Sequence, residues 1–254
     1  MELNYRIFGQ GPPLLILHGL FGTLDNWITL GKRWADHYTV VLIDLRNHGR
    51  SPHTDQHDYP GMAEDLREFM EHKWMYKASI LGHSMGGKTA MQFALEHPDM
   101  VEKLVVVDIA PKTYPGGHEL IFETLLALDL KTMDYREEAD DLIKARIDDL
   151  GVRQFLLKNL SRVRGGGFRW KMNLPVLWAH YQDILGAIDG DEPFAGPTLF
   201  VRGDRSSYVL DEDLPLIQSL FPAADLVTIP DAGHWVHAEQ PDELYEVVTR
   251  FLDA

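Results

Sequence analysis

Short apolar runs alternate with helical patterns over most of this chain, and few folds accept such an alternation. The runs have four or five residues, are mostly β-branched or leucine-rich, and seldom alternate apolar with polar positions. Strands that are buried on both faces of a parallel sheet have this composition. The predicted strands are Leu14–Leu17, Thr39–Ile43, Ala78–Leu81, Leu104–Val107, Thr198–Val201 and Leu226–Ile229.

Helical patterns fill most of the spaces between these runs. Their apolar residues recur at three- and four-residue spacing, which is typical of helices with one buried face. Alternating strands and helices predict βαβ units around a parallel sheet, that is, an α/β fold. Residues Leu3–Phe8 can add an outer antiparallel strand. The predicted helices are Trp27–His37, Met62–Met75, Met85–His97, Asp211–Leu220 and Asp242–Leu252.

The alternation stops between residues 112 and 191. No convincing strand is visible there, and Glu119–Leu130, Tyr135–Leu150 and Leu174–Ile188 are amphipathic. Roughly 80 residues exceed the dozen or so that a crossover needs. The segment leaves and re-enters at strand carboxyl ends, where α/β proteins form ligand sites. We therefore predict a helical cap over a substrate pocket, inserted into a core of residues 1–111 and 192–254. A separate helical domain is the alternative.

Composition excludes several classes of function. The 254 residues include no cysteine, which rules out disulfides, cysteine-ligated metal sites and cysteine nucleophiles. A formal charge of −15, from 24 Lys+Arg and 39 Asp+Glu, lacks the basic footprint that nucleic acid requires. No apolar stretch has the length of a signal peptide or a membrane helix. We expect a cytoplasmic protein with no membrane span, acting on a small molecule as a monomer or homodimer.

The strongest chemical motif is Gly82-His83-Ser84-Met85-Gly86. The predicted strand Ala78–Leu81 precedes it and the helix Met85–His97 follows at once. In this context the motif predicts a nucleophile elbow, a strained turn that holds the Ser84 hydroxyl at the tip of the sheet. The glycines allow the strand and helix backbones to pass close together. The alternative is an ordinary glycine-rich turn with a buried serine.

A serine hydroxyl needs a base to act as a nucleophile. His234 follows the last predicted strand, in the sequence Asp231-Ala232-Gly233-His234, and a loop there can reach back over the strand tips. We predict that His234 is this base. His237, three residues on, is the rival. His83 lies inside the elbow and is expected to support the site.

The acid that orients this histidine is open between two positions. Asp108 follows the predicted strand Leu104–Val107 and marks its tip. Adjacent strands lie about 4.8 Å apart, so this tip is close to that of the nucleophile strand. A buried carboxylate at this position would destabilise the fold unless it were paired with a charged group. The usual location is the loop after Thr198–Val201, where Ser206 stands in the place of the expected aspartate. Asp204 lies two positions earlier in that loop. Asp108 is favoured, Asp204 is the alternative, and Ser206 is expected to hydrogen-bond within the site.

Two backbone N–H groups are predicted to form an oxyanion hole. Met85 begins the helix after the nucleophile, and Leu20 lies in the glycine-flanked turn His18-Gly19-Leu20-Phe21-Gly22 at the first core strand's tip. Two such donors stabilise a tetrahedral oxyanion. The alternative for the Leu20 turn is an ordinary βα connection.

Motifs for metals and cofactors are absent. The sequence has no His-Glu-x-x-His, EF-hand loop, Walker lysine or dinucleotide fingerprint. Gly165–Gly167 lies inside the predicted cap rather than after a strand, so it is not a phosphate loop. We expect no cofactor and no metal.

At this point the chain resembles the α/β-hydrolase superfamily over nearly its full length. The carrying motifs are HGLFG, DLRNHGRS, GHSMGG and AGHWVH. More narrowly it is similar to bacterial YbfF-type esterases and their mitochondrial relatives, in Arg46-Asn47-His48-Gly49, Gly86-Gly87-Lys88, Asp108-Ile109-Ala110-Pro111, Ser206 with Tyr208-Val209, and Gly233-His234-Trp235-Val236-His237. In that group the usual acid position also lacks aspartate, and here the residue at that position is Ser206. The segment Gly203-Asp204-Arg205 departs from the group, which keeps Asp204 as a candidate for the acid.

The resemblance implies hydrolysis of carboxylic esters or thioesters under a small helical cap. We predict a serine esterase for short- to medium-chain esters, with an apolar pocket lined by Phe21, Phe122, Trp178 and Tyr181. For any one of the last three, packing inside the cap is the competing explanation. Alternative functions are C–C bond hydrolysis or a cofactor-free haloperoxidase-like activity with the same triad. A ligand-binding receptor on a hydrolase scaffold is a further alternative.

Overall fold

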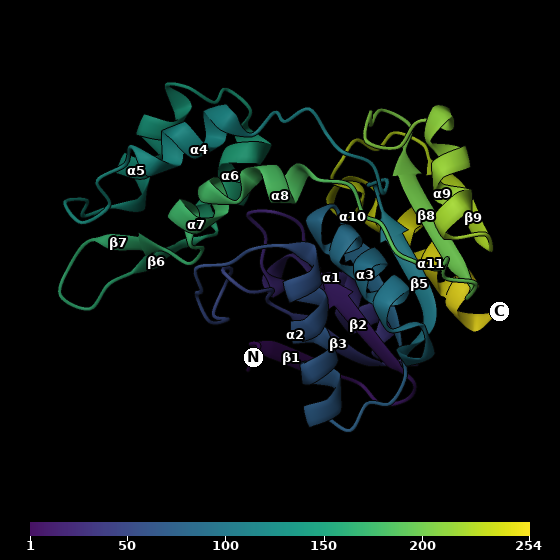
Figure 1. Cartoon of the computed structure of the whole chain (residues 1–254). Coiled ribbons are helices and arrows are strands. Elements are labelled where there is room, and N and C mark those ends of the chain that lie inside the picture. The colour runs from purple at the N-terminus through teal and green to yellow at the C-terminus, as the bar shows by residue number, and fades with distance from the viewer.

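A seven-stranded sheet forms the centre of the computed structural model, which describes all 254 residues (Figure 1). The strand order is β1-β3-β2-β4-β5-β8-β9, and every neighbouring pair is parallel except β1 with β3. The six predicted strands form the parallel part, and the outer antiparallel strand is present. The bounds are β1 Tyr5–Phe8, β2 Pro13–Leu17, β3 Thr39–Ile43, β4 Ala78–His83, β5 Val101–Val107, β8 Thr198–Gly203 and β9 Ala224–Ile229.

Helices cover both faces of this sheet because successive residues of each strand point to opposite sides. In β2, Leu14 and Ile16 pack in the cluster that includes Trp34 of α1, whereas Leu15 and Leu17 pack in the cluster of α2 and α3. The helices of this core are α1 Ile28–Trp34, α2 Tyr59–His72, α3 Met85–Glu96, α9 Leu214–Leu220, α10 Val236–Glu239 and α11 Pro241–Asp253, with short 3-10 helices η1 Leu24–Trp27, η2 Pro98–Met100 and η3 Asp211–Asp213.

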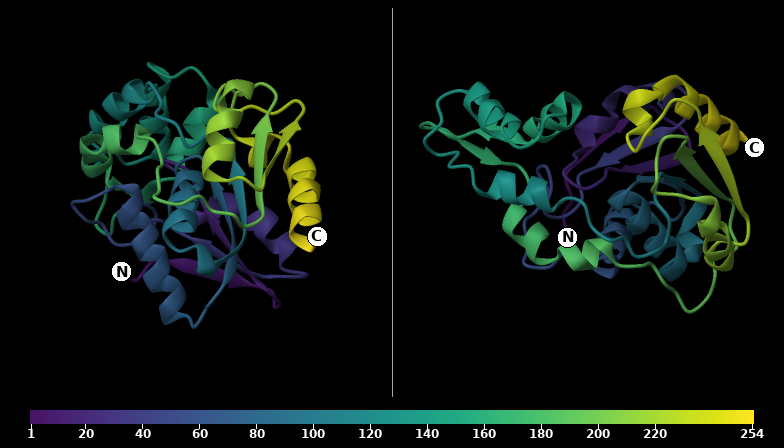
Figure 2. Two further views of the ribbon diagram at one scale, coloured as in Figure 1. Left: turned by 45° about the vertical axis from the view of Figure 1, so that its right-hand side comes forward. Right: turned by 90° about the horizontal axis from the view of Figure 1, so that it is seen from above.

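Residues 112–191, here called the insertion, lie between β5 and β8. Figure 1 shows the insertion in teal and green at the upper left, and Figure 2 shows it from above, to one side of the sheet. Its buried apolar residues belong to the same cluster as those of α2 and α3. Its elements are α4 Glu119–Leu126, α5 Arg136–Lys144, α6 Leu150–Leu157, β6 Leu160–Arg162, β7 Phe168–Trp170, α7 Leu174–Ala179 and α8 Tyr181–Leu185.

Two details of the insertion correct the sequence predictions. The predicted helix Tyr135–Leu150 ends at Lys144, and α6 begins separately where the Asp149 side chain accepts a hydrogen bond from the Val152 N–H. The hairpin β6–β7 was not predicted, because three-residue strands are too short to show a periodicity. The run Gly165–Gly167, with positive φ at all three residues, was its only signal.

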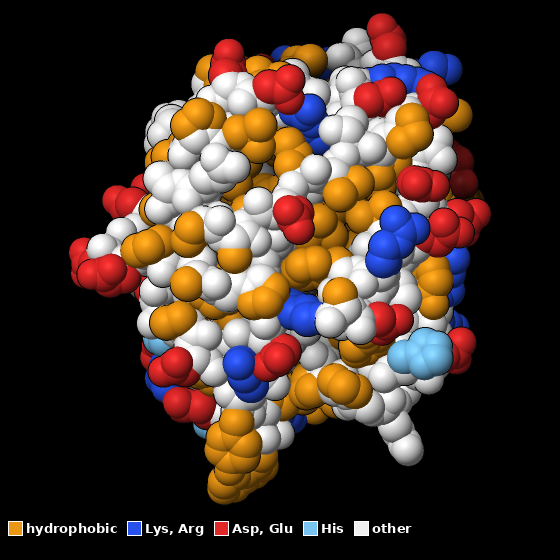
Figure 3. Space-filling view, turned by 90° about the vertical axis from the view of Figure 1, so that its right-hand side faces the viewer, with side chains coloured by type: hydrophobic (Ala, Val, Ile, Leu, Met, Phe, Trp, Pro, Cys, Tyr) orange, Lys and Arg blue, Asp and Glu red, His pale blue; other side chains and the backbone are white.

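The molecular surface reflects the acidic composition. On the face viewed in Figure 3, basic side chains are scattered among acidic and apolar ones and form no continuous basic surface. None of the helices combines the length and the apolar character needed to cross a lipid bilayer.

Candidate active site

Ser84 occupies a strained turn between β4 and α3. Its φ and ψ are 53° and −121°, a conformation that L-residues adopt only when the surrounding structure imposes it. Close backbone packing imposes it here. A β-carbon at Gly82 would lie 2.1 Å from the Gly86 carbonyl oxygen, and one at Gly86 would lie 2.5 Å from the His18 carbonyl oxygen. Any side chain at either glycine of the elbow would therefore collide with the neighbouring backbone.

His234 bridges Ser84 and Asp108. Its Nε2 lies 3.0 Å from the Ser84 Oγ, and its Nδ1 lies 2.7 Å from Asp108 Oδ2. Asp108 follows β5, is fully buried, and has a φ of 51°. Its carboxylate also accepts hydrogen bonds from the Gly203 N–H, at 3.2 Å, and from the Ser206 hydroxyl. The structure thus brings Ser84, His234 and Asp108 into one hydrogen-bonded chain, with Ser206 on the acid.

Asp204, the alternative acid, is used elsewhere. Its Oδ1 accepts a hydrogen bond from the Ala232 N–H at 3.2 Å, and its own N–H donates to the Ile229 carbonyl. These contacts join the loop after β8 to the loop that carries His234. No contact between Asp204 and the His234 ring is present, so Asp204 braces the loop rather than the imidazole.

The other two candidate histidines lie beside His234. His83 Nε2–H donates to the His234 carbonyl oxygen at 2.8 Å, and burial lowers the pKa of His83 well below its usual value. His237 stacks on Trp27 at 4.5 Å between ring centres, and burial lowers its pKa to about 3. Near pH 7 both rings are therefore uncharged, and they pack beside the loop that carries His234; neither contacts the Ser84 hydroxyl. Tyr208 stacks on the His234 ring at 3.8 Å.

The two predicted oxyanion donors belong to residues that line the cavities at Ser84. Met85 is the first residue of α3, where an N–H has no acceptor within the helix. The Leu20 N–H donates no hydrogen bond within the protein. Its turn is closed by the Gly22 N–H on the Gly19 carbonyl, at 2.9 Å, and His18 Nδ1–H donates to the same carbonyl at 2.8 Å.

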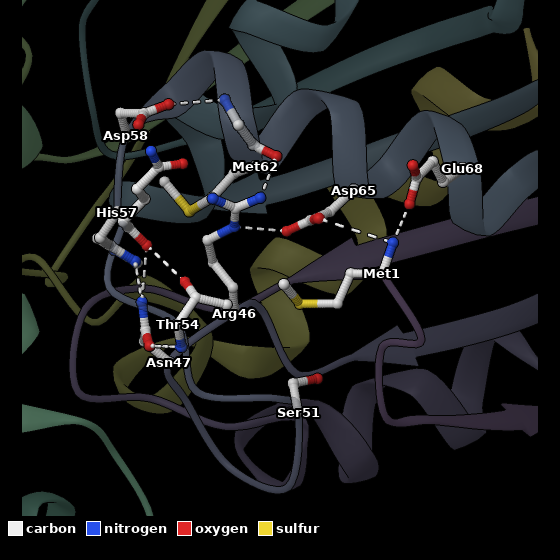
Figure 4. Close-up of polar contacts among 12 residues, drawn as sticks. Met1, Arg46, Asn47, Ser51, Thr54, His57, Asp58, Met62, Asp65 and Glu68 are labelled. Atoms are coloured by element: carbon white, nitrogen blue, oxygen red, sulfur yellow. Dashed lines mark hydrogen bonds and ion pairs between the residues drawn. The ribbon is translucent and has the colours of Figure 1, made fainter.

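A loop of residues 44–51 packs against the turn that contains Leu20. The Leu45 N–H donates to His18 Nε2 at 3.1 Å. Arg46 reaches α2 through a buried ion pair with Asp65, at 2.6 Å, and a hydrogen bond to the Gly61 carbonyl (Figure 4). The loop therefore connects the Leu20 turn to a helix of the core.

Two cavities meet at Ser84, with volumes of about 250 and 220 Å³. Four residues line both of them, namely Leu20, Ser84, His118 and Tyr208. His234 also lines the first cavity, and it lines a neighbouring groove together with Phe155 and Trp235 of the same cavity. The second is lined by residues of α3 and by residues near both ends of the insertion.

Three of the four predicted pocket residues lie outside these cavities. Phe21 lines the first cavity. Phe122, Trp178 and Tyr181 instead pack behind it as an aromatic cluster, with Phe122 at 4.9 Å from the Phe21 ring and 5.2 Å from the Tyr181 ring. Large apolar side chains of a small insertion are needed for its own interior, and composition cannot tell this role from pocket lining. The insertion residues that do line the first cavity are Gly117, His118, Ile121, Val152, Phe155 and Leu156.

Lys88 connects the insertion to α3. It lies one turn after Ser84 in α3, and its side chain is buried. Its Nζ donates to the Lys112 carbonyl at 2.8 Å, the Leu185 carbonyl at 3.2 Å and the Gly186 carbonyl at 2.5 Å. These acceptors lie in the two segments that connect the insertion to the core. Three acceptors use all three N–H bonds of an ammonium group.

Replacing Lys88 with methionine is expected to lower the free energy of unfolding by about 3 kcal/mol, because three buried carbonyls lose their donor. Urea denaturation measures the change. Lys77→Met is the matched control, since Lys77 is half exposed and pairs only with exposed Glu102; it should cost less than about 1 kcal/mol. Equal effects of the two substitutions would contradict a clamp by Lys88.

No group of three or more His, Asp or Glu side chains is arranged to hold a metal ion.

A family model described as the alpha/beta hydrolase fold matches residues 12–241 of the chain. The chain is 41% identical to the mouse sn-1-specific diacylglycerol lipase ABHD11, over 99% of this chain and 85% of the mouse protein. It is 37% identical to the esterase YbfF of Escherichia coli, over 100% of both chains.

A solved structure described as a marine microorganism esterase superimposes with a TM-score of 0.97 and 45% identity, covering 98% of this chain and 99% of that one. The family match spans most of the chain, and the similar proteins are named as esterases and lipases. The chain therefore belongs to the α/β-hydrolase family.

Proposed function

We propose that this protein is a serine carboxylesterase that hydrolyses short- to medium-chain esters through a covalent acyl-enzyme. The supporting observation is the chain from Ser84 through His234 to Asp108, with contacts of 3.0 and 2.7 Å, at the point where two cavities meet. A hydroxyl, an imidazole and a buried carboxylate in this order suit acyl transfer. The similar proteins named as esterases and lipases point to the same chemistry.

The proposed reaction has two halves. In the first, Ser84 Oγ attacks the ester carbonyl carbon while His234 Nε2 takes the hydroxyl proton. The carbonyl oxygen becomes an oxyanion that accepts hydrogen bonds from the Leu20 and Met85 N–H groups. The C–O bond breaks as His234 returns the proton to the leaving alcohol. In the second half, water attacks the acyl-enzyme with His234 as base, and the acid leaves Ser84 free.

In this proposal the alcohol and acyl parts of the ester bind in different cavities. His234 must reach the oxygen of the leaving alcohol, and of these two cavities it lines the first and not the second, so the alcohol is assigned to the first. The acyl group then occupies the second cavity, whose volume of about 220 Å³ suits short to medium chains. We also propose that the insertion acts as a cap, because its residues form walls of both cavities.

Hydrolysis of p-nitrophenyl esters from acetate to decanoate tests this function. We expect kcat/KM to reach the ordinary enzyme range, above about 10⁴ M⁻¹s⁻¹, for a short or medium chain and to fall for the longest ones. Turnover no faster than the uncatalysed reaction for every ester would contradict the proposal and favour a ligand-binding role.

Enlarging one cavity wall at a time should separate acyl from alcohol preference. Ile184 lines only the second cavity, so Ile184→Phe is expected to lower kcat/KM for octanoate about tenfold more than for acetate. Val152 lines only the first, so Val152→Phe should instead discriminate against bulky alcohols. Butanoate esters of ethanol and benzyl alcohol measure the second effect. Reversed preferences would exchange the two assignments.

A further inference from the structure

We propose that His118 sets the preference of this site for oxygen esters over thioesters, by donating its Nε2–H to the alkoxy oxygen of the scissile ester. This inference rests on the proposed esterase function. His118 belongs to the insertion, immediately before α4. It has no part in the triad or in the predicted oxyanion hole.

The position of His118 places it at the scissile bond. Only four residues line both cavities, and His118 is the one that the insertion contributes. Ser84 must meet the ester carbonyl carbon at this junction. The carbonyl oxygen turns toward the Leu20 and Met85 N–H groups, which leaves the alkoxy oxygen as the acceptor that the ester group still offers.

Tyr181 fixes which nitrogen of His118 carries the hydrogen. The Tyr181 hydroxyl oxygen accepts the His118 backbone N–H at 2.9 Å and lies 2.9 Å from His118 Nδ1. If the hydroxyl donates to Nδ1, both the Tyr181 hydroxyl and His118 Nδ1 have a partner. If Nδ1 were the donor, the hydroxyl hydrogen would have no acceptor inside a buried side chain. The satisfied arrangement puts the ring hydrogen on Nε2.

Nothing in the protein uses this Nε2–H. It makes no hydrogen bond, and it is not among the buried unpartnered atoms, which are His48 Nε2, Asn159 Oδ1 and His237 Nδ1. The atom is therefore open to the space around it, and His118 lines the cavities. Burial, followed by the nearby His234, lowers the pKa of His118 to about 4. Near pH 7 the ring is a neutral donor, so it does not oppose the imidazolium that forms on His234.

The aromatic cluster behind the cavity gives this ring its orientation. Tyr181 packs edge-on against the His118 ring, at 5.9 Å and 87°, and stacks on Trp178 at 5.7 Å. Phe21 meets His118 from the cavity side at 6.0 Å. A ring held on two sides and bonded at Nδ1 keeps Nε2 directed at one place.

Sulfur separates this role from simple packing. A thioester has sulfur where an ester has the alkoxy oxygen, and sulfur is a weak hydrogen-bond acceptor. A donor aimed at that atom therefore assists acylation by an ester and contributes little to acylation by a thioester. Since kcat/KM reports events up to acylation, the ratio of its values for the two substrates isolates the contact.

The test compares ethyl butanoate with S-ethyl thiobutanoate, which form the same butanoyl-enzyme. Release of butanoic acid measures both rates. Against the wild type, His118→Phe should lower kcat/KM about tenfold for the ester and less than about twofold for the thioester. His118→Gln keeps an N–H donor and should recover part of the loss. Tyr181→Phe, which frees the ring, should show a smaller loss that is also confined to the ester.

Each outcome decides the question. An equal loss on both substrates, or no loss, in a folded His118→Phe enzyme overturns the role of His118 while the esterase function stands. If that variant does not fold, Tyr181→Phe decides in the same way. A wild type that hydrolyses neither substrate, or a Ser84→Ala variant that retains full activity, overturns the proposed function itself and this inference with it.

Discussion

Substituting alanine for Ser84 should reduce kcat for p-nitrophenyl butanoate by about 10⁵- to 10⁶-fold, the scale seen when a triad nucleophile is removed. The residual rate comes from binding and from the oxyanion donors alone. Stability should change little, because the Ser84 side chain caps no helix N–H and its hydroxyl contacts only His234. Alanine also keeps a β-carbon in the same turn. Steady-state rates and a thermal melt measure both quantities.

Ser207 provides the matched control for that experiment. Its side chain lines the second cavity and makes no hydrogen bond within the protein. Ser207→Ala therefore deletes the same hydroxyl from a wall of the site without touching the triad. We expect kcat within about twofold of the wild type, since an unpartnered hydroxyl at a cavity wall contributes little. A comparable collapse in both variants would show that cavity shape, not nucleophilic attack, limits the rate.

Much of the fold was predictable because burial on both faces leaves a clear pattern in a strand. Val40 to Ile43 of β3 are all buried, and no polar residue interrupts them. The limits of other strands were less accessible. β4 runs on through Gly82 and His83, and β5 starts at Val101, because backbone pairing with neighbours continues beyond the apolar run. Pairing of this kind is a property of two strands and cannot be read from one.

The insertion was predicted less well, because its side chains compete for two apolar environments. A cavity wall and a helix interface call for the same residue types. Phe122 is fully buried in the interface, while Ile121, its neighbour in sequence, lines the cavity. The direction in which α4 turns these residues depends on how the insertion sits on the core. His118 gave no signal at all, since one histidine among 12 has no distinguishing context.

The acid was the site residue that sequence reasoning left open, and the reason is geometric. Asp108 and Asp204 both follow parallel strands that lie side by side, β5 and β8, so both tips are near the same loop. A separation of a few ångströms at the carboxylate decides which one meets His234. In the structure Asp108 points into the site from a backbone with a φ of 51°, a turn that no sequence pattern announced.

Replacing Asp108 with asparagine should lower kcat about 10⁴-fold, whereas Asp204→Asn should leave it within about threefold. The new amide can donate to His234 Nδ1, which forces the hydrogen onto Nε2, and an Nε2–H cannot accept the Ser84 proton. It also removes the negative charge that stabilises the imidazolium. At Asp204 the asparagine oxygen still accepts the Ala232 N–H, so the loop keeps its contact. Rates on p-nitrophenyl butanoate compare the pair directly, and a larger loss in Asp204→Asn would transfer the role to that residue.

The loss in kcat for Ser206→Ala should fall between the losses for these two variants. Asp108 would keep its charge and its contact with His234 while losing one of the donors that hold it in place.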